Sequence, residues 1–367
     1  MNSRFDVCVR GGGVVGMALA LQLASLRLRV ALLARDEPRA GDVRAYALNS
    51  ASRALLSALR VWPQPAHATP VQQMQVWGDD GGALAFDSAQ VGSEALAWIV
   101  DVPALEQQLG QAVSYQSLIE RFDIRGAAPT AALTVVCEGR ASHTRDLLGA
   151  RYTTRSYGQH AIAARLSCEL PHAQTARQWF AGGEILALLP LAGNSVALVW
   201  SVPDDQHPAL MQLSAEAFQQ RLQQATHGTL GALTLTSERA AWPLGIGRAE
   251  RWVGSGWALA GDAAHSIHPL AGQGLNVGLA DVAALSHVLQ ARQGKDYWRE
   301  LGDIRLLRRY ERARKADVAA MGGLTDGLHQ LFSQGDRRWQ LLRNQGMNAF
   351  ERSGPLKQWA ARQAMGL

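Results

Sequence analysis

Long apolar runs are missing from this 367-residue chain. A membrane-spanning helix needs about 18 or more consecutive apolar residues, and no run reaches that length. The most apolar segment near the start, residues 14–26, is interrupted by Gln22 and preceded by three glycines. This is typical of a buried helix and not of a secretion signal. We therefore expect neither a membrane span nor an export signal.

Cysteine is also scarce. Cys8, Cys137 and Cys168 stand singly, without a CxxC pair. This spacing excludes a disulfide framework and a cysteine zinc site, and it favours a reducing compartment, the cytoplasm. Basic grooves interleaved with aromatic residues are lacking as well, so no nucleic-acid partner is expected. The 11 tryptophans are expected in the core and in pocket walls.

The net charge of +5 is unevenly distributed along the chain. Residues 301–367 hold 12 Lys and Arg against 6 Asp and Glu, a balance of +6 that leaves −1 for the rest. Such a segment attracts anionic lipid headgroups or acidic partners. A solvated helical face has the same composition, so charge alone leaves both interpretations open.

The first motif with chemical content is a glycine turn. "FDVCV" predicts a buried strand, "MALALQLASLRL" has helical spacing of apolar residues, and "RVALL" predicts a second strand. Between the first strand and the helix, Gly11, Gly13 and Gly16 fit GxGxxG. The first glycine permits a tight turn, the second lets a pyrophosphate approach, and the third lets helix pack on strand. The unit predicts a dinucleotide cofactor, either FAD or NAD.

The acidic residue that usually binds the cofactor ribose is missing. It is expected at the end of the second strand, about 20 residues after the glycines, where this chain has Ala34. The nearest acids are Asp36 and Glu37. Either Asp36 substitutes through a local shift, or the ribose contact is absent.

The pattern along the rest of the chain predicts a β-rich segment inserted between two halves of a nucleotide-binding domain. Residues 44–59 and 214–226 are predicted helical, whereas 163–202 are mainly strands, with a hairpin in "EILALLPLAGNSVALVWSV". Residues 257–259 form a short strand, and the pattern after Gly274 is helical to the end.

A second glycine-rich stretch, "GDAAHSIHPLAGQGLNVGLADVAAL" at residues 261–285, contains no Lys, Arg or Glu. Asp262 follows a strand and should lie at its carboxyl edge, where ligands of open α/β sheets sit. Backbone N–H groups near Leu275 could hold a partial negative charge at a helix start. His265 and His268 are expected to be hydrogen-bonded packing residues and not metal ligands, because Pro269 ends a loop at His268.

This stretch resembles the flavin-contact motif of the ubiquinone-biosynthesis hydroxylases (UbiH-like), which are single-component FAD-dependent aromatic monooxygenases. The resemblance extends to the first glycine motif and to "DVRAYALN", "GQHAIAARLSCELPH", "ARQWFAGGEILALLPL", "LRRYERARKAD" and "LTDGLHQLFS". It implies hydroxylation of the aromatic ring of a polyprenyl phenol in ubiquinone biosynthesis. FAD, NAD(P)H as a transient reductant and O2 would act through a flavin C4a-hydroperoxide.

The resemblance also implies the residues of the cofactor site. The turn at residues 11–16 and Arg44 would hold the pyrophosphate, Asp262 the ribityl chain, and Pro269 with residues 272–276 the ring. "CEGRASHTR" resembles the family's DG motif, with Glu138 in place of aspartate. The implied contacts are Gly11, Gly13, Val14, Val15, Gly16, Arg35, Arg44, Glu138, Gly139, Gly261, Asp262, Pro269, Gly272, Gly274, Leu275 and Asn276. No catalytic side chain is implied, because the flavin carries the chemistry; His268 and Pro269 are expected near it.

The implied fold is an α/β Rossmann-like FAD-binding domain of the glutathione-reductase type, with an inserted β-sheet substrate domain and a helical C-terminus. We assign residues 1–62, 98–150 and 250–300 to the FAD domain, 63–97 and 151–249 to the substrate domain, and 301–367 to the helical region. The implied partners are a polyprenyl phenol or other aromatic substrate, O2, a biosynthetic complex and a membrane surface contacted by the basic C-terminal region. The implied location is the cytoplasm, peripheral on the inner face of the membrane.

Four features depart from the family pattern. They are Ala34, Glu138, the pair Val102 and Pro103 where polar or basic residues are usual, and a segment at 110–132 too short for the family's β-meander. They leave alternatives open: a non-catalytic or weakly flavin-binding member of a quinone-biosynthesis complex, a hydroxylase of a soluble aromatic compound, or a flavin reductase acting on prenyl chains.

Overall fold

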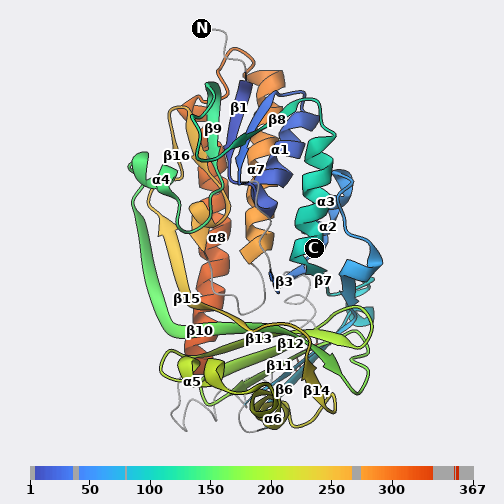
Figure 1. Ribbon diagram of the computed structural model, residues 1–367. Helices are drawn as coiled ribbons and strands as arrows, with labels where there is room; N and C mark the ends of the chain where they lie inside the picture. Colours follow the sequence, from blue (N-terminus) through green and yellow to red (C-terminus); the bar gives the residue numbers. More distant parts are fainter. Residues whose placement is uncertain are drawn as a thin grey trace.

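The computed structural model describes residues 5–35, 41–78, 81–266, 274–333, 351 and 353–354. Two large sheets lie one above the other in Figure 1, and a small third sheet lies between them. Long helices pack beside the upper sheet, and two short helices lie against the lower one. Among the described residues, no helix is both long enough and apolar enough to cross a bilayer.

The upper sheet is mostly parallel, and β1 lies at its centre. Val7 of β1 is the register partner of Val30 on one side and of Leu133 on the other. Every residue of β2 is buried, as expected for a strand covered on both faces. The strands in spatial order are β16 (Val253–Gly254), β17 (Trp257–Leu259), β9 (Ala131–Val136), β1 (Phe5–Arg10), β2 (Val30–Ala34) and β8 (Ile119–Asp123).

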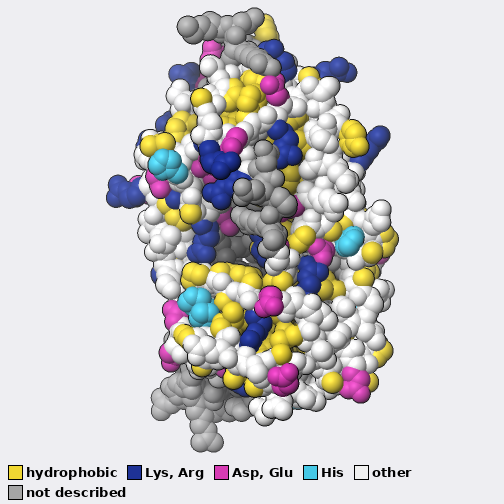
Figure 2. All heavy atoms as spheres, viewed as in Figure 1, with side chains coloured by type: hydrophobic (Ala, Val, Ile, Leu, Met, Phe, Trp, Pro, Cys, Tyr) yellow, Lys and Arg dark blue, Asp and Glu magenta, His cyan; other side chains and the backbone are white. Residues whose placement is uncertain are grey.

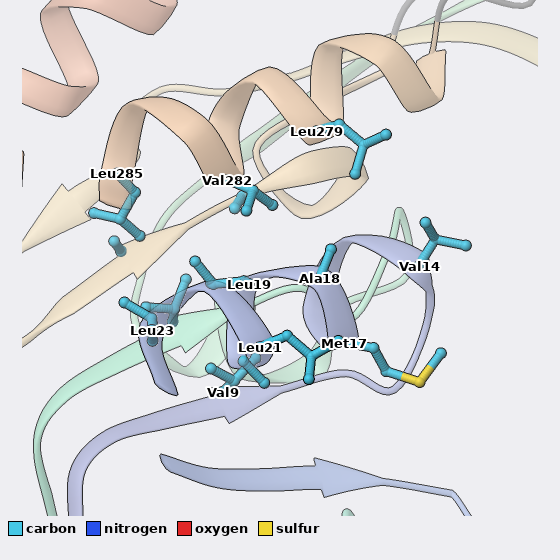
Figure 3. Close-up of a cluster of buried hydrophobic side chains, with 14 of the residues drawn as sticks. Val9, Val14, Met17, Ala18, Leu19, Leu21, Leu23, Leu279, Val282 and Leu285 are labelled. Atoms are coloured by element: carbon cyan, nitrogen blue, oxygen red, sulfur yellow. The ribbon is translucent and has the colours of Figure 1, made fainter. Parts of the chain in front are cut away.

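Helix α1 (Val14–Ser25) forms the centre of the upper core. It is apolar on nearly all sides, which is typical of a helix buried all round. Figure 3 shows Leu19 and Leu23 of α1 pointing toward Val282 and Leu285 of α7 (Gly274–Lys295), while Val9 of β1 lies on the opposite side. α3 (Val102–Ser114) packs beside α1, and α8 (Ile304–Ser333) packs on α7.

The opposite face of the upper sheet is covered by the short link between β8 and β9. β8 pairs with β2, whereas β9 pairs with the far side of β1. The short link between them, residues 124–130, therefore crosses two strands. Ile124 and Phe122 pack with Phe5, Cys8 and Leu33 on this face. This link lies within residues 110–132, the segment that was predicted to be too short for the family's β-meander.

The lower sheet is largely antiparallel and carries the longest strand, β10, which bends at an irregularity between Ser156 and Gln159. Figure 1 shows β10 and β15 running from beside the upper sheet into the lower one. The strands in spatial order are β18 (His265–Ser266), β15 (Ala240–Ala249), β10 (Tyr152–Cys168), β13 (Ser195–Pro203), β12 (Glu184–Pro190), β11 (Thr175–Ala181), β5 (Gln73–Trp77) and β6 (Ala83–Asp87), with β14 (Leu233–Leu235) paired to β10.

The two faces of the lower sheet have different neighbours. Ile162, Leu198 and Trp200 pack under α6 (Ala215–Ala225) and α5 (His207–Gln212). Because side chains alternate along a strand, Ala163, Val199 and their neighbours point to the opposite face. That face turns toward the upper part of the molecule, since Ala197 packs with Ile99 of the small sheet.

The small sheet corrects one prediction. Residues 44–59 were expected to be helical throughout, but Ala45–Leu48 form β3, which pairs with β7 (Ala97–Asp101) beside β4 (Ala68–Val71). Pairing with a distant strand overrides local helix propensity here. α2 (Ser50–Ala58) starts only after Asn49, whose side chain accepts a hydrogen bond from the Ser52 N–H at 2.9 Å.

The other predicted elements agree with the structure, except that the helical pattern after Gly274 is interrupted by a non-helical segment at residues 296–303. The hairpin predicted within residues 163–202 is β12–β13, the short strand is β17, and α6, α7 and α8 lie where helices were predicted. The remaining elements are short: α4 (His143–Leu147), η1 (Pro65–His67), η2 (Ala89–Val91) and η3 (Gly261–Ala263). The α/β fold class is confirmed, whereas the exact division into domains stays a prediction.

Candidate cofactor site

Three loops meet at the carboxyl ends of the parallel strands β1, β9 and β17. They carry the first glycine turn, the segment around Glu138, and the turn at Gly261 and Asp262. Open α/β sheets bind their ligands at this edge. Segments far apart in sequence are thereby brought to one place.

The first turn requires glycine at two positions. Gly11 has φ +122°, and a Cβ atom there would lie 2.3 Å from the Cys137 carbonyl oxygen. A Cβ atom on Gly16 would lie 1.9 Å from the Gly11 carbonyl oxygen. Both distances are far below van der Waals contact, so β1, the turn and α1 can approach only because these residues lack side chains.

Gly13 differs from its neighbours, because a Cβ atom there would meet nothing within 4 Å. Gly13 caps the N-terminus of α1 and supplies no side-chain hydrogen bond, and the first turn of α1 has no acidic residue. The N–H groups of that first turn have no acceptor within the helix and lie at the positive end of the helix dipole. This cradle fits a pyrophosphate.

The second turn packs directly on the first. Gly261 has φ +62°, and a Cβ atom there would lie 3.4 Å from the methyl carbons of Val15. A Cβ atom on Gly278 of α7 would lie 2.7 Å from a Val15 methyl carbon. The two glycine motifs thus form one continuous site, joined through Val15 and continued by Val14 at the start of α1.

Asp262 is solvent-exposed although protein surrounds it. The surrounding protein raises the pKa of its carboxyl, while His265 and Arg140 act in the opposite direction. An exposed side chain with a desolvated carboxyl lies in a hollow and not on a convex surface. Tyr152 borders this hollow, since its hydroxyl donates to the Asp262 carbonyl oxygen at 3.2 Å and its ring lies 4.0 Å from the Arg145 guanidinium carbon.

The carboxylate of Glu138 is fully engaged by protein partners. It accepts hydrogen bonds from Arg10 Nε at 2.8 Å, Ser142 Oγ at 2.8 Å and Thr144 Oγ1 at 2.7 Å. Burial raises the pKa of Glu138, but these hydrogen bonds more than offset it, so the pKa lies below its ordinary value. Gly139 follows with φ +82°. The longer side chain in place of aspartate therefore anchors the DG-like loop to β1.

Replacing Glu138 with glutamine should destabilise the protein in a pH-dependent way. The folded state lowers the pKa of Glu138, so its contribution is fully present above the ordinary value of 4.5 and is lost as the pH falls through the lowered value. At neutral pH the loss should be about 1–3 kcal/mol. Thermal unfolding of both proteins from pH 7 down to about pH 2.5 checks this, and a difference in Tm that stays constant below pH 4.5 would contradict it.

Of the two arginines predicted to contact the cofactor, Arg44 is paired with acids and Arg35 is exposed. Arg44 lies just before β3 and donates from Nε to both Asp42 oxygens at 2.8 and 3.0 Å, with Glu106 3.6 Å from its Nη2. Asp42 and Glu106 thus compensate the charge of Arg44. To bind a phosphate, the Arg44 guanidinium would have to give up its contact with Asp42. Arg35 is exposed directly after β2.

At the end of β2, where an acidic residue usually binds the cofactor ribose, the structure places Ala34. The buried methyl group of Ala34 packs against Gly12, where a Cβ atom would lie only 2.5 Å away. The register partner of Ala34 on β8 is Asp123, whose carboxylate is paired with Arg125 at 2.7 Å. Asp36 and Glu37 lie outside the described residues.

The start of α7 is tied to the small sheet. Asn276, which follows Gly274 and Leu275, accepts hydrogen bonds from Ser52 Oγ at 2.7 Å and the Asn49 N–H at 3.0 Å, and donates to the Ala47 carbonyl at 2.8 Å. Its side chain therefore fixes the start of α7 against the small sheet, and its contact with a cofactor stays a prediction. His268, Pro269 and Gly272 lie outside the described residues, so their roles stay predictions.

Sequence reasoning missed a buried charge network behind this site. Asp281 of α7 contacts the Gly261 N–H, His265 and Arg314 of α8. His265 is a buried hydrogen-bonded residue, as predicted, with its ring 4.8 Å from that of Trp252. The available signal for Asp281 was a lone acid in a helical pattern that carries no other Asp, Glu, Lys or Arg before Arg292.

Comparison with known proteins agrees with this site. A protein-family model described as an FAD binding domain matches residues 121–322. The chain is 34% identical over 386 residues to the ubiquinone hydroxylase UbiL of Rhodospirillum rubrum, covering 98% of this chain and 89% of that protein. It is 32% identical over 401 residues to the 3-demethoxyubiquinol 3-hydroxylase of Escherichia coli, covering 100% of both.

A solved structure of P. aeruginosa PqsL in complex with 2-aminobenzoylacetate has a TM-score of 0.80 at 21% identity, covering 94% of this chain and 99% of that chain. The fold and the matched domain define the class, an FAD-dependent monooxygenase. Within that class, the chain belongs to the ubiquinone-biosynthesis hydroxylase family. The resemblance seen in the sequence is confirmed.

Proposed function

We propose that this protein uses FAD, NAD(P)H and O2 to hydroxylate the aromatic ring of a polyprenyl phenol in ubiquinone biosynthesis. The observation that carries the proposal is the meeting of the two glycine turns beside Asp262. A ligand with a pyrophosphate at one end and a hydrogen-bonding chain next to it matches both turns. The names of the relatives from Rhodospirillum rubrum and Escherichia coli supply the substrate class.

The protein's own contribution is binding, orientation and exclusion of water. The first turn of α1 holds the pyrophosphate and Asp262 the ribityl chain, while the α7 N-terminus offers N–H groups to the ring. Bound there, FAD would accept a hydride from NAD(P)H and activate O2 for oxygen transfer. The reaction balances as one oxygen atom placed on the ring and the other released as water, with NAD(P)H oxidised.

The upper face of the lower sheet suits an apolar substrate. Ala161, Ala163, Ala187 and Val199 lie on this face, and the last two are only half-buried. The partly exposed side chains of Ala187 and Val199 offer apolar surface to a flat ring or a prenyl chain. Figure 2 shows the surface hollowed between the two sheets, with hydrophobic side chains along its lower rim.

Purified protein incubated with FAD tests the proposal against its alternatives. We expect a yellow protein that oxidises NAD(P)H faster when a short-chain prenyl phenol is present, and a product heavier by one oxygen atom. A colourless protein that FAD cannot reconstitute would support a weakly flavin-binding member of a complex. Product mass separates hydroxylation from prenyl reduction, and a soluble phenol used in parallel identifies the preferred substrate.

Membrane contact belongs to the proposal because a prenylated substrate resides in lipid. Tyr297 and Trp298, between α7 and α8, are 70% and 64% exposed. Arg305, Arg308 and Arg312 are exposed along one face of α8; within the described residues, no acid forms a salt bridge with any of these three. Aromatic side chains and arginines of this kind favour an anionic lipid surface.

Reversing these three charges should weaken membrane binding. Each basic residue near an anionic surface contributes about 1 kcal/mol, so Arg305→Glu, Arg308→Glu and Arg312→Glu together should reduce binding to anionic vesicles about a hundredfold. A control with Arg60→Glu, Arg121→Glu and Arg151→Glu changes the net charge equally at other exposed positions. Equal losses in both variants, or no loss in the first, would remove this surface from the proposal.

A further inference from the structure

We propose that Asp281 of α7 is a positioning residue for the cofactor. Asp281 holds the Gly261–Asp262 turn from behind, and Arg314 holds Asp281. The inference rests on the proposed function, since it concerns how the turn that contacts FAD is kept in place.

The carboxylate of Asp281 has three donors. One oxygen, Oδ2, accepts from the Gly261 N–H at 2.8 Å and from His265 Nε2 at 2.7 Å. The other, Oδ1, accepts from Arg314 Nε at 2.7 Å. Asp281 is 0% exposed. Its carboxylate therefore contacts the backbone immediately before Asp262 and has no contact with bulk solvent.

Two buried side chains of helix α8, Arg314 and Tyr310, connect it to the Gly261–Asp262 turn. Besides Asp281, Arg314 contacts the Val277 carbonyl oxygen at 3.2 Å through Nη2 and the exposed Asp317 at 2.7 Å through Nη1. One turn earlier, the Tyr310 hydroxyl donates to the Leu259 carbonyl oxygen at 2.8 Å. Leu259 ends β17, two residues before Gly261. The helix thus fixes both the strand that leads into the turn and the acid behind it.

A contribution to folding stability does not by itself explain the buried ion pair of Asp281 and Arg314. A buried ion pair replaced by apolar residues of similar volume is often neutral or stabilising. What apolar residues cannot supply is an acceptor for the Gly261 N–H. Gly261 adopts φ +62°, so its peptide group is oriented away from ordinary strand geometry, and a fixed acceptor defines how Asp262 is presented.

The experiment compares two double variants, so that neither leaves a buried charge without its partner. In Asp281→Asn with Arg314→Met, the side-chain oxygen can still accept from the Gly261 N–H. In Asp281→Leu with Arg314→Met, the shape is similar but no acceptor remains. We expect the first to bind FAD within about threefold of wild type and the second at least tenfold more weakly, the range expected for an unsatisfied buried donor. The second apoprotein should unfold at a slightly lower Tm than the first, because its Gly261 N–H is left without an acceptor.

A cycle with Asp262→Ala provides a readout that a merely structural role would not move. If Asp281 acts through the turn, Asp281→Leu with Arg314→Met should cost little further FAD affinity in the Asp262→Ala background. Additive losses, or equal FAD affinity of the two double variants, would overturn the inference. Asp317→Asn removes only the exposed partner of Arg314 and should bind FAD like wild type. A wild-type protein that fails to bind FAD would instead overturn the proposed function itself.

Discussion

Replacing Gly16 with alanine should disrupt the cofactor site and destabilise the whole upper domain. The new Cβ atom would lie 1.9 Å from the Gly11 carbonyl oxygen and 3.4 Å from the Cys137 Cβ. Backbone must move to relieve the first contact, because no flexible side chain is involved. Overpacking of this kind costs about 1–3 kcal/mol and occasionally more. We expect a lower apoprotein Tm and a purified protein without FAD.

Gly110 offers the matched control for Gly16. It lies within α3, and a Cβ atom there would meet nothing within 4 Å. Gly110→Ala should therefore leave FAD content unchanged and stabilise the helix by up to about 1 kcal/mol. If Gly16→Ala kept the wild-type Tm and FAD content, the close packing of α1 on the turn would be wrong.

Replacing Gly13 with alanine should separate cofactor binding from stability. Its Cβ atom would meet no protein atom within 4 Å, and its φ of −81° is open to any residue. The apoprotein should unfold within about 1 kcal/mol of wild type, the scale of a cap substitution. The methyl group would, however, stand where a pyrophosphate approaches the α1 N-terminus, so FAD affinity should fall at least tenfold.

The contrast between the two glycines is the informative result. Titration of each apoprotein with FAD, followed by flavin fluorescence, gives the affinity, and thermal unfolding without FAD gives the stability. Gly16→Ala should change both quantities and Gly13→Ala only the first. Wild-type FAD affinity in Gly13→Ala would show that the pyrophosphate does not bind at this turn.

Sequence patterns predicted the elements whose order follows from local periodicity. The βαβ unit, the β12–β13 hairpin and the short β17 strand each carry their own signal in apolar spacing and turn residues. β3 was missed because Ala45–Leu48 become a strand only by pairing with β7, about 50 residues later. Local propensity contains no information about that partner.

In the cofactor site, too, local sequence patterns predicted some residues, whereas long-range contacts could not be predicted. Gly11 and Gly16 could be predicted from the sequence because the packing of the turn requires residues without side chains at a fixed spacing. The contact between Asp281 and Arg314 could not be predicted from the sequence, because the two residues lie on separate helices and meet only in the folded core. Likewise, Glu138 looked like a departure from the DG motif, yet its longer side chain reaches Arg10 and Thr144 and stabilises the loop.

The source of the oxygen atom in the product tests the central claim most directly. Wild-type protein reconstituted with FAD is incubated with NAD(P)H, a short-chain prenyl phenol and heavy-oxygen-labelled O2, and the product is analysed by mass spectrometry. We expect a ring-hydroxylated product that carries one labelled oxygen atom from O2. A product labelled only from water, or NAD(P)H oxidation with the phenol unchanged, would contradict an FAD-dependent ring hydroxylase.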